Sequence, residues 1–164
     1  MRDEEFERLY EEHAAGLLAF LAYRTGDRAL AEDVVADTFE RVLRARRRFD
    51  PRRGSRKTWV YWIAINRLRD LQRSRQSEQR ALTRIEPAAP SGVAELETIE
   101  HQDELTAALA QLSVEEREAS ALRYGGDLTV PEIARLQGER LSTVEGRVYR
   151  GLRKLRDLLD RPAP

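Results

Sequence analysis

Several common features are missing from this sequence. None of its 164 residues is cysteine, which excludes disulfides, thiolate zinc sites and cysteine nucleophiles and fits a reducing compartment. Aromatic residues make up only 7% of the chain, so its core must be built mainly from leucine, valine, isoleucine and alanine. The most apolar run, residues 14–23, is too short to cross a bilayer.

Signals for export and for catalysis are also absent. The N-terminal segment MRDEE is acidic and lacks the basic and apolar regions of a signal peptide, so we expect a cytoplasmic protein. The sequence contains no Gly-rich phosphate loop, no metal-ligand cluster and no nucleophile–base pair. Its two histidines, His13 and His101, are isolated and stand beside acids. We therefore expect no enzymatic activity, no cofactor and no metal.

The formal net charge of +0 conceals a strong segregation of charge along the chain. Residues 1–40 carry four basic and eleven acidic side chains, whereas residues 41–75 carry thirteen basic and two acidic ones. Residues 95–118 are acidic again, and the chain is basic from residue 132 onward. This pattern indicates a polyanion-binding surface flanked by acidic faces with another role. The simpler alternative is a set of solvated helix faces.

Apolar residues recur at helical spacing through the first half of the chain. They predict helices over residues 5–22, 29–46 and 58–73, with a break at Gly26-Asp27 and a loop around Pro51 and Gly54. The pattern is lost over residues 76–94, where EPAAPSGVA is typical of an interdomain linker. No segment shows the two-residue period of a strand.

Helix-start signals mark the second half of the chain. Three S/T-x-x-E capping boxes occur there, and they pair Ser113 with Glu116, Thr129 with Glu132, and Ser142 with Glu145. Together with a helix over 95–111, they predict helices over 113–124, 129–136 and 142–160, the last two forming a helix-turn-helix around Gly138. The expected fold is all-α, with two small helical domains (1–76 and 96–164) joined by a flexible linker (77–95).

The stretch RRGSRKTWVYWIAINRLRDLQRSR, residues 52–75, interleaves eight basic side chains with three aromatic ones. Cations beside stacking surfaces are what single-stranded nucleic acid requires. Trp59 and Trp62 share a stripe with apolar neighbours and Trp59 is expected in the core, whereas Tyr61 lies on another face and is expected to be exposed. Asn66 and Asp70 are one turn apart and could read base edges or hydrogen-bond to each other.

The last predicted helix, within LSTVEGRVYRGLRKLR, has the pattern of a helix that enters a DNA major groove. Its cations follow the first turn, at Arg147 and Arg150 among others, and suit phosphates along the groove. Glu145 has two interpretations. It could cap the helix at Ser142, or it could accept a hydrogen bond from cytosine N4.

These segments together resemble the bacterial RNA polymerase sigma factors, specifically the compact extracytoplasmic-function group. The matching words in the first half are LYEEH, TGDRALAEDVVADTFERVL, RRFDPRRG and RKTWVYWIAINRLRDLQR. In the second half they are ALAQLSVEEREASALRY, LTVPEIARLQG and STVEGRVYRGLRKLRDLL. Their order and spacing make the resemblance specific. It implies a sigma2 helical bundle followed by a sigma4 helix-turn-helix domain.

The resemblance also implies partners and roles. The helix over 29–46 would dock through Asp33, Asp37 and Glu40 on the clamp helices of the largest polymerase subunit. The loop and helix that follow would recognise and melt the promoter −10 element, with a flipped base held around Ser55, Arg56 and Lys57. The remaining −10 contacts expected on this segment are Arg52, Arg53, Tyr61, Asn66, Arg67, Asp70 and Arg73.

The helix-turn-helix would read the −35 element as duplex DNA, while its other side meets the flap of the second-largest subunit. The residues expected at the −35 element are Arg140, Ser142, Thr143, Glu145, Arg147 and Arg150. The chain departs from the usual family pattern at Ala36, at Glu139-Arg140 and at Glu145, which shifts the expected start of the recognition helix to Ser142. Many relatives also bind an anti-sigma factor.

The alternative function is a stand-alone transcriptional repressor or activator that uses only the helix-turn-helix. It accounts for residues 113–160 but leaves the basic aromatic segment without a role. It also predicts tight duplex binding without polymerase, whereas a sigma factor is expected to bind promoter DNA poorly when free.

Overall fold

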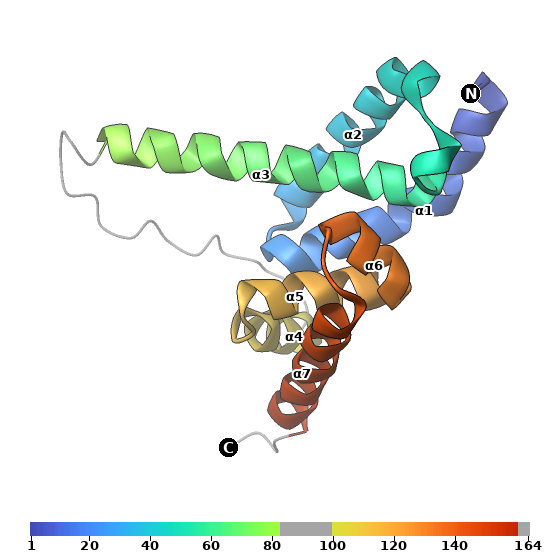
Figure 1. The fold of residues 1–164 in the computed structure, drawn as a ribbon. Coiled ribbons are helices and arrows are strands. Elements are labelled where there is room, and N and C mark those ends of the chain that lie inside the picture. Colours follow the sequence, from blue (N-terminus) through green and yellow to red (C-terminus); the bar gives the residue numbers. More distant parts are fainter. Residues whose placement is uncertain (83–99, 161–164) are drawn as a thin grey trace.

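The computed structural model describes residues 1–82 and 100–160, which form helices and no strand (Figure 1). The α-helices in chain order are α1 (Asp3–Thr25), α2 (Arg28–Ala45), α3 (Arg56–Leu82), α4 (Glu100–Ala110), α5 (Val114–Ser120), α6 (Val130–Gln137) and α7 (Leu141–Leu159). We refer to α1–α3 as the N-terminal unit and to α4–α7 as the C-terminal unit. The expected linker and the start of the expected helix over 95–111 lie largely outside the described residues.

In the N-terminal unit, α1 and α2 form an antiparallel pair and α3 packs across both. Gly26 ends α1 in the left-handed conformation (φ 69°), where glycine lacks the Cβ that strains other residues. Asp27 then caps α2 through its side chain. The apolar stripes of the three helices meet in a core that includes Leu17, Phe20, Leu21, Val34, Val42 and Val60, all fully buried.

A short irregular segment connects α2 to α3. It contains two 3₁₀ turns, η1 (Arg46–Arg48) and η2 (Pro51–Arg53). The Ser55 side chain accepts from the backbone N–H of Thr58 at 3.1 Å and so caps α3. The end predicted for this helix, near residue 73, is wrong, because α3 continues to Leu82. Its last turns are polar and exposed, so no apolar periodicity revealed them.

The C-terminal unit confirms two of the three capping boxes. Ser113 with Glu116 and Thr129 with Glu132 each make both reciprocal hydrogen bonds. Gly138 ends α6 in the left-handed conformation (φ 67°), as expected. Between α5 and α6 the chain makes a π-helical turn, η3 (Ala121–Gly125).

The third capping box, predicted from Ser142 and Glu145, is wrong. Helix α7 begins one residue earlier, at Leu141, with Arg140 at the N-cap and no side-chain cap hydrogen bond. Ser142 is therefore already inside the helix, and Glu145 is beyond the position that can reach back to the cap. Sequence spacing alone could not distinguish this register from its neighbour.

The two units pack directly on each other rather than standing apart. Helix α1 contacts η3 and α5, and α3 contacts α6, an arrangement visible where the orange C-terminal helices lie against α1 and α3 (Figure 1). Buried apolar side chains of both units form one continuous cluster, in which Phe20 and Tyr61 join Leu122, Leu128 and Ile133.

Candidate nucleic-acid interface

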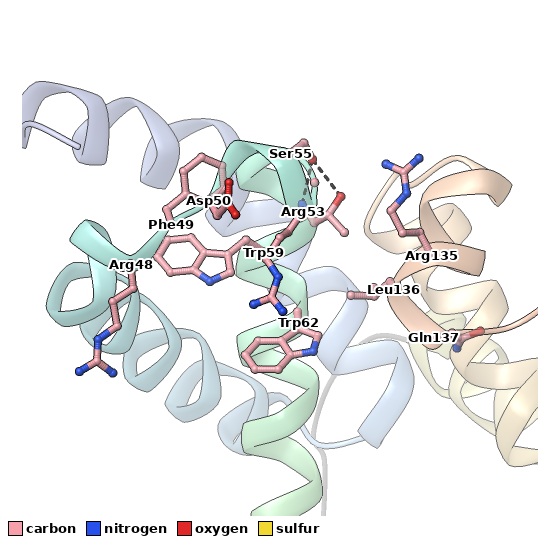
Figure 2. A pocket seen from close by; sticks show the side chains of 13 residues that line it. Arg48, Phe49, Asp50, Arg53, Ser55, Trp59, Trp62, Arg135, Leu136 and Gln137 are labelled. Atoms are coloured by element: carbon pink, nitrogen blue, oxygen red, sulfur yellow. Dashed lines mark hydrogen bonds between the residues drawn. The ribbon is translucent and has the colours of Figure 1, made fainter.

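A cleft of about 490 Å³ opens where the α2–α3 connection faces α6. Figure 2 shows Trp59 and Trp62 projecting from the N-terminal unit on one side, with Arg135 to Gln137 on the other. The residues that line the cleft are Arg48, Phe49, Asp50, Arg53, Gly54, Ser55, Thr58, Trp59, Trp62, Arg135, Leu136, Gln137 and Gly138. Both units therefore contribute to its walls.

Three aromatic rings give the cleft stacking surfaces. The rings of Phe49 and Trp59 pack at a centroid distance of 5.3 Å, and the guanidinium of Arg56 lies over Phe49 at 5.8 Å. Trp62 is 54% exposed, an unusual position for an indole in a folded protein. Trp59, which was expected in the core, is only partly buried. Its ring packs against Phe49.

The charges around the cleft are unbalanced. Arg48 and Arg53 from the N-terminal unit and Arg135 from the C-terminal unit line it, and none of them has a carboxylate partner within the described residues. Many other described arginines, such as Arg41 and Arg44, are paired with acids. Unpaired guanidinium groups beside exposed indoles form a surface that suits phosphates and bases together.

The expected exposure of Tyr61 is wrong. Its side chain is only 1% exposed, and its hydroxyl donates to the backbone oxygen of Gly126 at 3.3 Å. Burial, and then the charge of Asp127, raise the pKa of this phenol well above its usual value. Tyr61 lies on the stripe of α3 that also carries Ala64, Ile65 and Leu68 in the core, so it cannot stack on a base in this conformation.

The three residues expected around a flipped base are in different environments. Ser55 is occupied by capping, since its hydroxyl lies 2.8 Å from that of Thr58. Arg56 pairs with Glu5 at 3.2 Å, which together with a backbone hydrogen bond lowers the pKa of that carboxyl. Lys57 donates to the backbone oxygen of Asp127, at 2.7 Å, in the C-terminal unit. Each of the three side chains therefore already has a partner within the protein.

One face of α3 continues from the cleft and carries several of the expected −10 residues. Trp62, Arg69, Asp70 and Arg73 are exposed on it, and Asn66 is partly exposed. Asn66 donates to the backbone oxygen of Trp62 at 2.8 Å, one turn back along its own helix, so the hydrogen bond to Asp70 considered as an alternative does not form. Asp70 itself is available to an outside partner.

The expected polymerase-binding acids lie on the outer side of α2. Asp33 and Glu40 are exposed, and Glu40 pairs with Arg44 one turn later. Asp37 is partly buried and pairs with two arginines, Arg41 and Arg67. Arg67, which was expected to contact DNA, is therefore paired with Asp37, which was expected to contact polymerase.

The helix-turn-helix presents most of its expected −35 residues to solvent. Arg140, Ser142 and Glu145 are exposed and Thr143 is partly exposed. Arg147 pairs with Glu139 at 3.3 Å. With the cap excluded, the charge of Glu145 has no structural partner within the described part of the chain, which leaves the base-contact interpretation open.

Arg150 belongs to a charge network under α7. Its guanidinium lies 3.5 Å from the buried carboxylate of Glu116, which also accepts from Lys154 at 2.7 Å. The strongest influence on the pKa of Glu116 is the hydrogen bond from Lys154, which lowers it, while burial of the carboxyl raises it. This network ties α5 to α7 and fixes the orientation of the recognition helix.

The residues expected at the −10 element did not include several that line the cleft, among them Arg48, Phe49, Trp62 and Arg135. For Trp62 a signal existed, because its position with Asn66, Arg69 and Arg73 defines the polar stripe of α3 and opposes the apolar one. Arg135 could not have been found in this way, since only tertiary packing brings α6 to the α2–α3 connection.

The described residues show neither a metal-binding cluster nor a membrane-spanning helix. No group of three or more His, Asp or Glu side chains there is arranged to hold a metal ion. No described helix is long and apolar enough to span a membrane. The cationic and aromatic cleft, together with the helix-turn-helix whose α6 forms one of its walls, is typical of a nucleic-acid-binding protein.

Comparison with known proteins identifies the family. Residues 9–78 match the family model of sigma-70 region 2, and residues 102–155 match that of sigma-70 region 4. The chain is 34% identical to the RNA polymerase sigma factor CarQ of Myxococcus xanthus, over 95% of this chain and 90% of that one. It is 31% identical to the ECF RNA polymerase sigma factor RpoE of Cereibacter sphaeroides, over 94% and 87%.

Solved structures agree on the fold. The sigma factor RpoE of Bartonella quintana, crystallised with the anti-sigma factor NepR, matches with a TM-score of 0.78 at 24% identity over 98% of this chain and 99% of that one. CnrH, in complex with the cytosolic domain of CnrY, matches with a TM-score of 0.71 at 25% identity, over 99% and 92%.

The chain belongs to the extracytoplasmic-function group of RNA polymerase sigma factors. It is therefore a transcription initiation factor and not an enzyme, and it directs core RNA polymerase to specific promoters. The stand-alone repressor or activator is not favoured, because the N-terminal half also matches a sigma-factor region, region 2, beside the match of the C-terminal half to region 4.

Proposed function

We propose that the cleft and the exposed face of α3 capture the melted −10 strand. The observation that carries this assignment is the exposed Trp62 beside the unpaired Arg48 and Arg53. Beyond the cleft, the strand would follow Asn66, Asp70 and Arg73 along α3. Arg52, which is exposed, would supply phosphate contacts directly, and Arg56, Lys57 and Arg67 would do so once released from their present partners. Ser55 would hold the loop that receives the flipped base.

The energy balance of strand capture supports this use of aromatic residues. Extruding a base from the duplex costs a few kcal/mol, and stacking on an aromatic side chain returns about 1–3 kcal/mol per base. Trp62 and Trp59 are both positioned to stack, and phosphate contacts add a salt-dependent contribution. Together these terms can offset the cost of one or two unpaired bases, so melting would be completed when the polymerase holds the remaining DNA.

The C-terminal unit would read the −35 element as duplex, with α7 in the major groove. Thr143 and Glu145 are suited to base edges, Glu145 to cytosine N4 in particular. Arg140, Ser142, Arg147 and Arg150 are suited to phosphates. Because Glu139 and Glu116 hold two of these arginines, the guanidinium groups would be presented in fixed positions and not as mobile charges.

Polymerase would be bound by other faces. We assign Asp33, Asp37 and Glu40 on α2 to the clamp helices of the largest subunit, and the side of the helix-turn-helix away from DNA to the flap of the second-largest subunit. The functional domains would then be 1–76 for core binding and the −10 element, 77–95 as linker, and 96–164 for the −35 element. The protein would act in the cytoplasm, where core polymerase works, and an anti-sigma factor would be a further partner.

The direct test is transcription in vitro with bacterial core polymerase and fragmented GC-rich genomic DNA, with and without this protein. We expect defined transcript starts that require the protein, and their upstream sequences would give both elements. Trp62→Ala should strongly reduce these starts, while Glu115→Ala, at an exposed acid of α5, should not. Specific duplex binding without any initiation would contradict the proposal and favour the repressor.

A further inference from the structure

The cleft between the units adjoins a second cavity, of about 770 Å³. The two share Phe49, Arg53 and Arg135 among their lining residues. Small-molecule sites in proteins have volumes of about 300–1,000 Å³ and are found preferentially where two domains meet. The paired cavities therefore have the size and the position of a small-molecule site.

The two cavities differ in their chemistry. The second is lined, within the described residues, by no acid and by four arginines, namely Arg52, Arg53, Arg56 and Arg135. Of these, Arg56 alone has a carboxylate partner in the described part of the chain, Glu5 at 3.2 Å. The cleft instead contains both tryptophans of the chain and the carboxylate of Asp50. Positive charge and stacking surface thus lie in adjoining compartments.

The positive charge in the second cavity is more concentrated than a DNA strand requires. Each phosphodiester of a strand carries one negative charge, and successive phosphates are spaced along the backbone. A terminal phosphate carries about −1.5 to −2 near neutral pH, and a polyphosphate places several anionic groups side by side. Guanidinium groups bind phosphate oxygens in a bidentate manner. Four of them around one cavity therefore suit a polyphosphate.

The aromatic rings of the cleft suit a nucleobase. Trp62 is 54% exposed, and Trp59 packs against Phe49. Figure 2 shows these three rings on one side of the cleft and Arg135 on the other. A base stacked on an indole here would have its phosphates directed to the arginines that the two cavities share.

Asp50 adds a preference among bases. Its carboxylate lines the cleft and not the arginine-rich cavity. One oxygen accepts from the backbone N–H of Arg52 at 3.0 Å, and an ionised carboxylate has capacity for further hydrogen bonds on both oxygens. Guanine presents two adjacent donors, its N1–H and its N2 amino group, to such an acceptor. Adenine presents an unprotonated N1, which would face the carboxylate unfavourably.

We propose that the two cavities form a binding site for a free guanine nucleoside polyphosphate, with the base at Trp62 and Asp50 and the phosphates among the arginines. The nucleotide would contact both units, since Arg135 belongs to α6 and the other groups belong to the N-terminal unit. It would compete with a DNA strand for the cleft, so initiation by this protein would respond to nucleotide concentration. Because the nucleotide needs neither DNA nor polymerase to bind, its binding is tested separately from the proposed function of the cleft.

The tryptophans supply the readout, because the only two in the chain both line the cleft. GTP would be titrated into the purified protein while tryptophan emission is recorded, and calorimetric titration would give the affinity without interference from absorbance by the base. We expect saturable quenching by GTP. Guanosine, which lacks the phosphates, and inorganic tripolyphosphate, which lacks the base, should each bind about tenfold more weakly or worse. ATP should also bind about tenfold more weakly than GTP.

Substitutions test the two halves of the site. Arg53→Ala and Arg135→Ala each remove an exposed guanidinium and should weaken GTP binding about tenfold or more. The matched controls are Arg75→Ala on α3 and Arg153→Ala on α7, exposed arginines that line neither cavity. They change the net charge equally and should bind GTP as the parent does. Asp50→Asn should reduce the preference for GTP over ATP.

Several outcomes would overturn the inference. One is the absence of saturable GTP binding below about 1 mM. Another is binding of tripolyphosphate as tight as that of GTP, which would reveal a general anion site. Equal losses in the control variants would reveal a response to net charge alone, and equal affinity for ATP and GTP would overturn the guanine assignment. GTP binding as expected, in a protein that fails to initiate transcription with core polymerase, would overturn the proposed function and leave this site standing.

Discussion

The carboxylate of Asp37 on α2 lies 2.5 Å from the Nε of Arg67 on α3. This ion pair joins a residue proposed to contact polymerase to one proposed to contact the −10 strand. A second arginine, Arg41, reaches the same carboxylate oxygen at 3.0 Å. Polymerase that engages Asp37 would therefore weaken the hold on Arg67 and make it more available to DNA.

This relationship predicts energetic coupling between Asp37 and Arg67. In a double-mutant cycle with Asp37→Ala and Arg67→Ala, urea unfolding should give a coupling energy of about 0.5–1 kcal/mol, because the pair is partly shielded from solvent. The more exposed pair of Glu40 and Arg44 is the control and should give a smaller value. If the effects of the two substitutions on the unfolding free energy were strictly additive, the ion pair between Asp37 and Arg67 would not be maintained in solution.

Trp62 and Tyr61 are neighbours in sequence but should respond oppositely to substitution. Trp62→Ala removes an exposed stacking surface, so we expect unchanged thermal stability and a loss of about 1–3 kcal/mol in promoter melting, measured with 2-aminopurine in the −10 element. Tyr61→Ala empties a buried site and should lower the unfolding free energy by about 3–5 kcal/mol. Equal melting defects with equal stability in the two variants would contradict the assignment of Trp62.

Glu145→Lys tests how the recognition helix selects DNA. Since Glu145 has no capping role, the substitution should leave thermal stability nearly unchanged, and so should Ser142→Ala, which would have mattered had the predicted box formed. We expect higher nonspecific DNA affinity, a plot of log K against log salt steeper by about one unit, and blurred −35 selectivity. The affinity is measured by fluorescence anisotropy over a salt series. Unchanged slope and unchanged promoter choice would exclude Glu145 from the interface.

Glu116 should make the stability of the protein depend on pH. The hydrogen bond from Lys154 keeps the pKa of this carboxyl below its usual value of 4.5 in the folded state. Its stabilising contribution is therefore fully present above the unfolded pKa and is lost as the pH falls through the folded pKa. The difference in unfolding free energy between the parent and Glu116→Gln, of about 1–3 kcal/mol near neutrality, should shrink in acid.

The measurement for Glu116 is urea unfolding at a series of pH values from about 6 to about 3. Glu115→Gln, one position earlier and exposed, should show no such convergence with the parent. If the difference for Glu116→Gln stayed constant across the series, the carboxylate charge would not contribute to the packing of α5 on α7.

The sequence by itself determined the helices and much of the family assignment. Apolar periodicity follows directly from the 3.6-residue turn, and the signals at Ser113, Thr129 and Gly138 act within a few residues, so each could be read locally. The order of the matching segments also predicts where the two proposed reading surfaces lie, including the basic aromatic segment that contains Trp62.

Only the tertiary structure decided the environment of individual side chains. Tyr61 lies on the apolar stripe of α3, but the partner that covers its hydroxyl, Gly126, lies far along the chain, and the sequence does not show that contact. The start of α7 at Leu141 depends on how α6 and its turn pack. The capping box predicted between Ser142 and Glu145 therefore does not form, although the two residues have the required spacing. The approach of Arg135 to the cleft, and the packing of the two units on each other, arise from contacts distant in sequence, whose formation depends on the summed packing of both units.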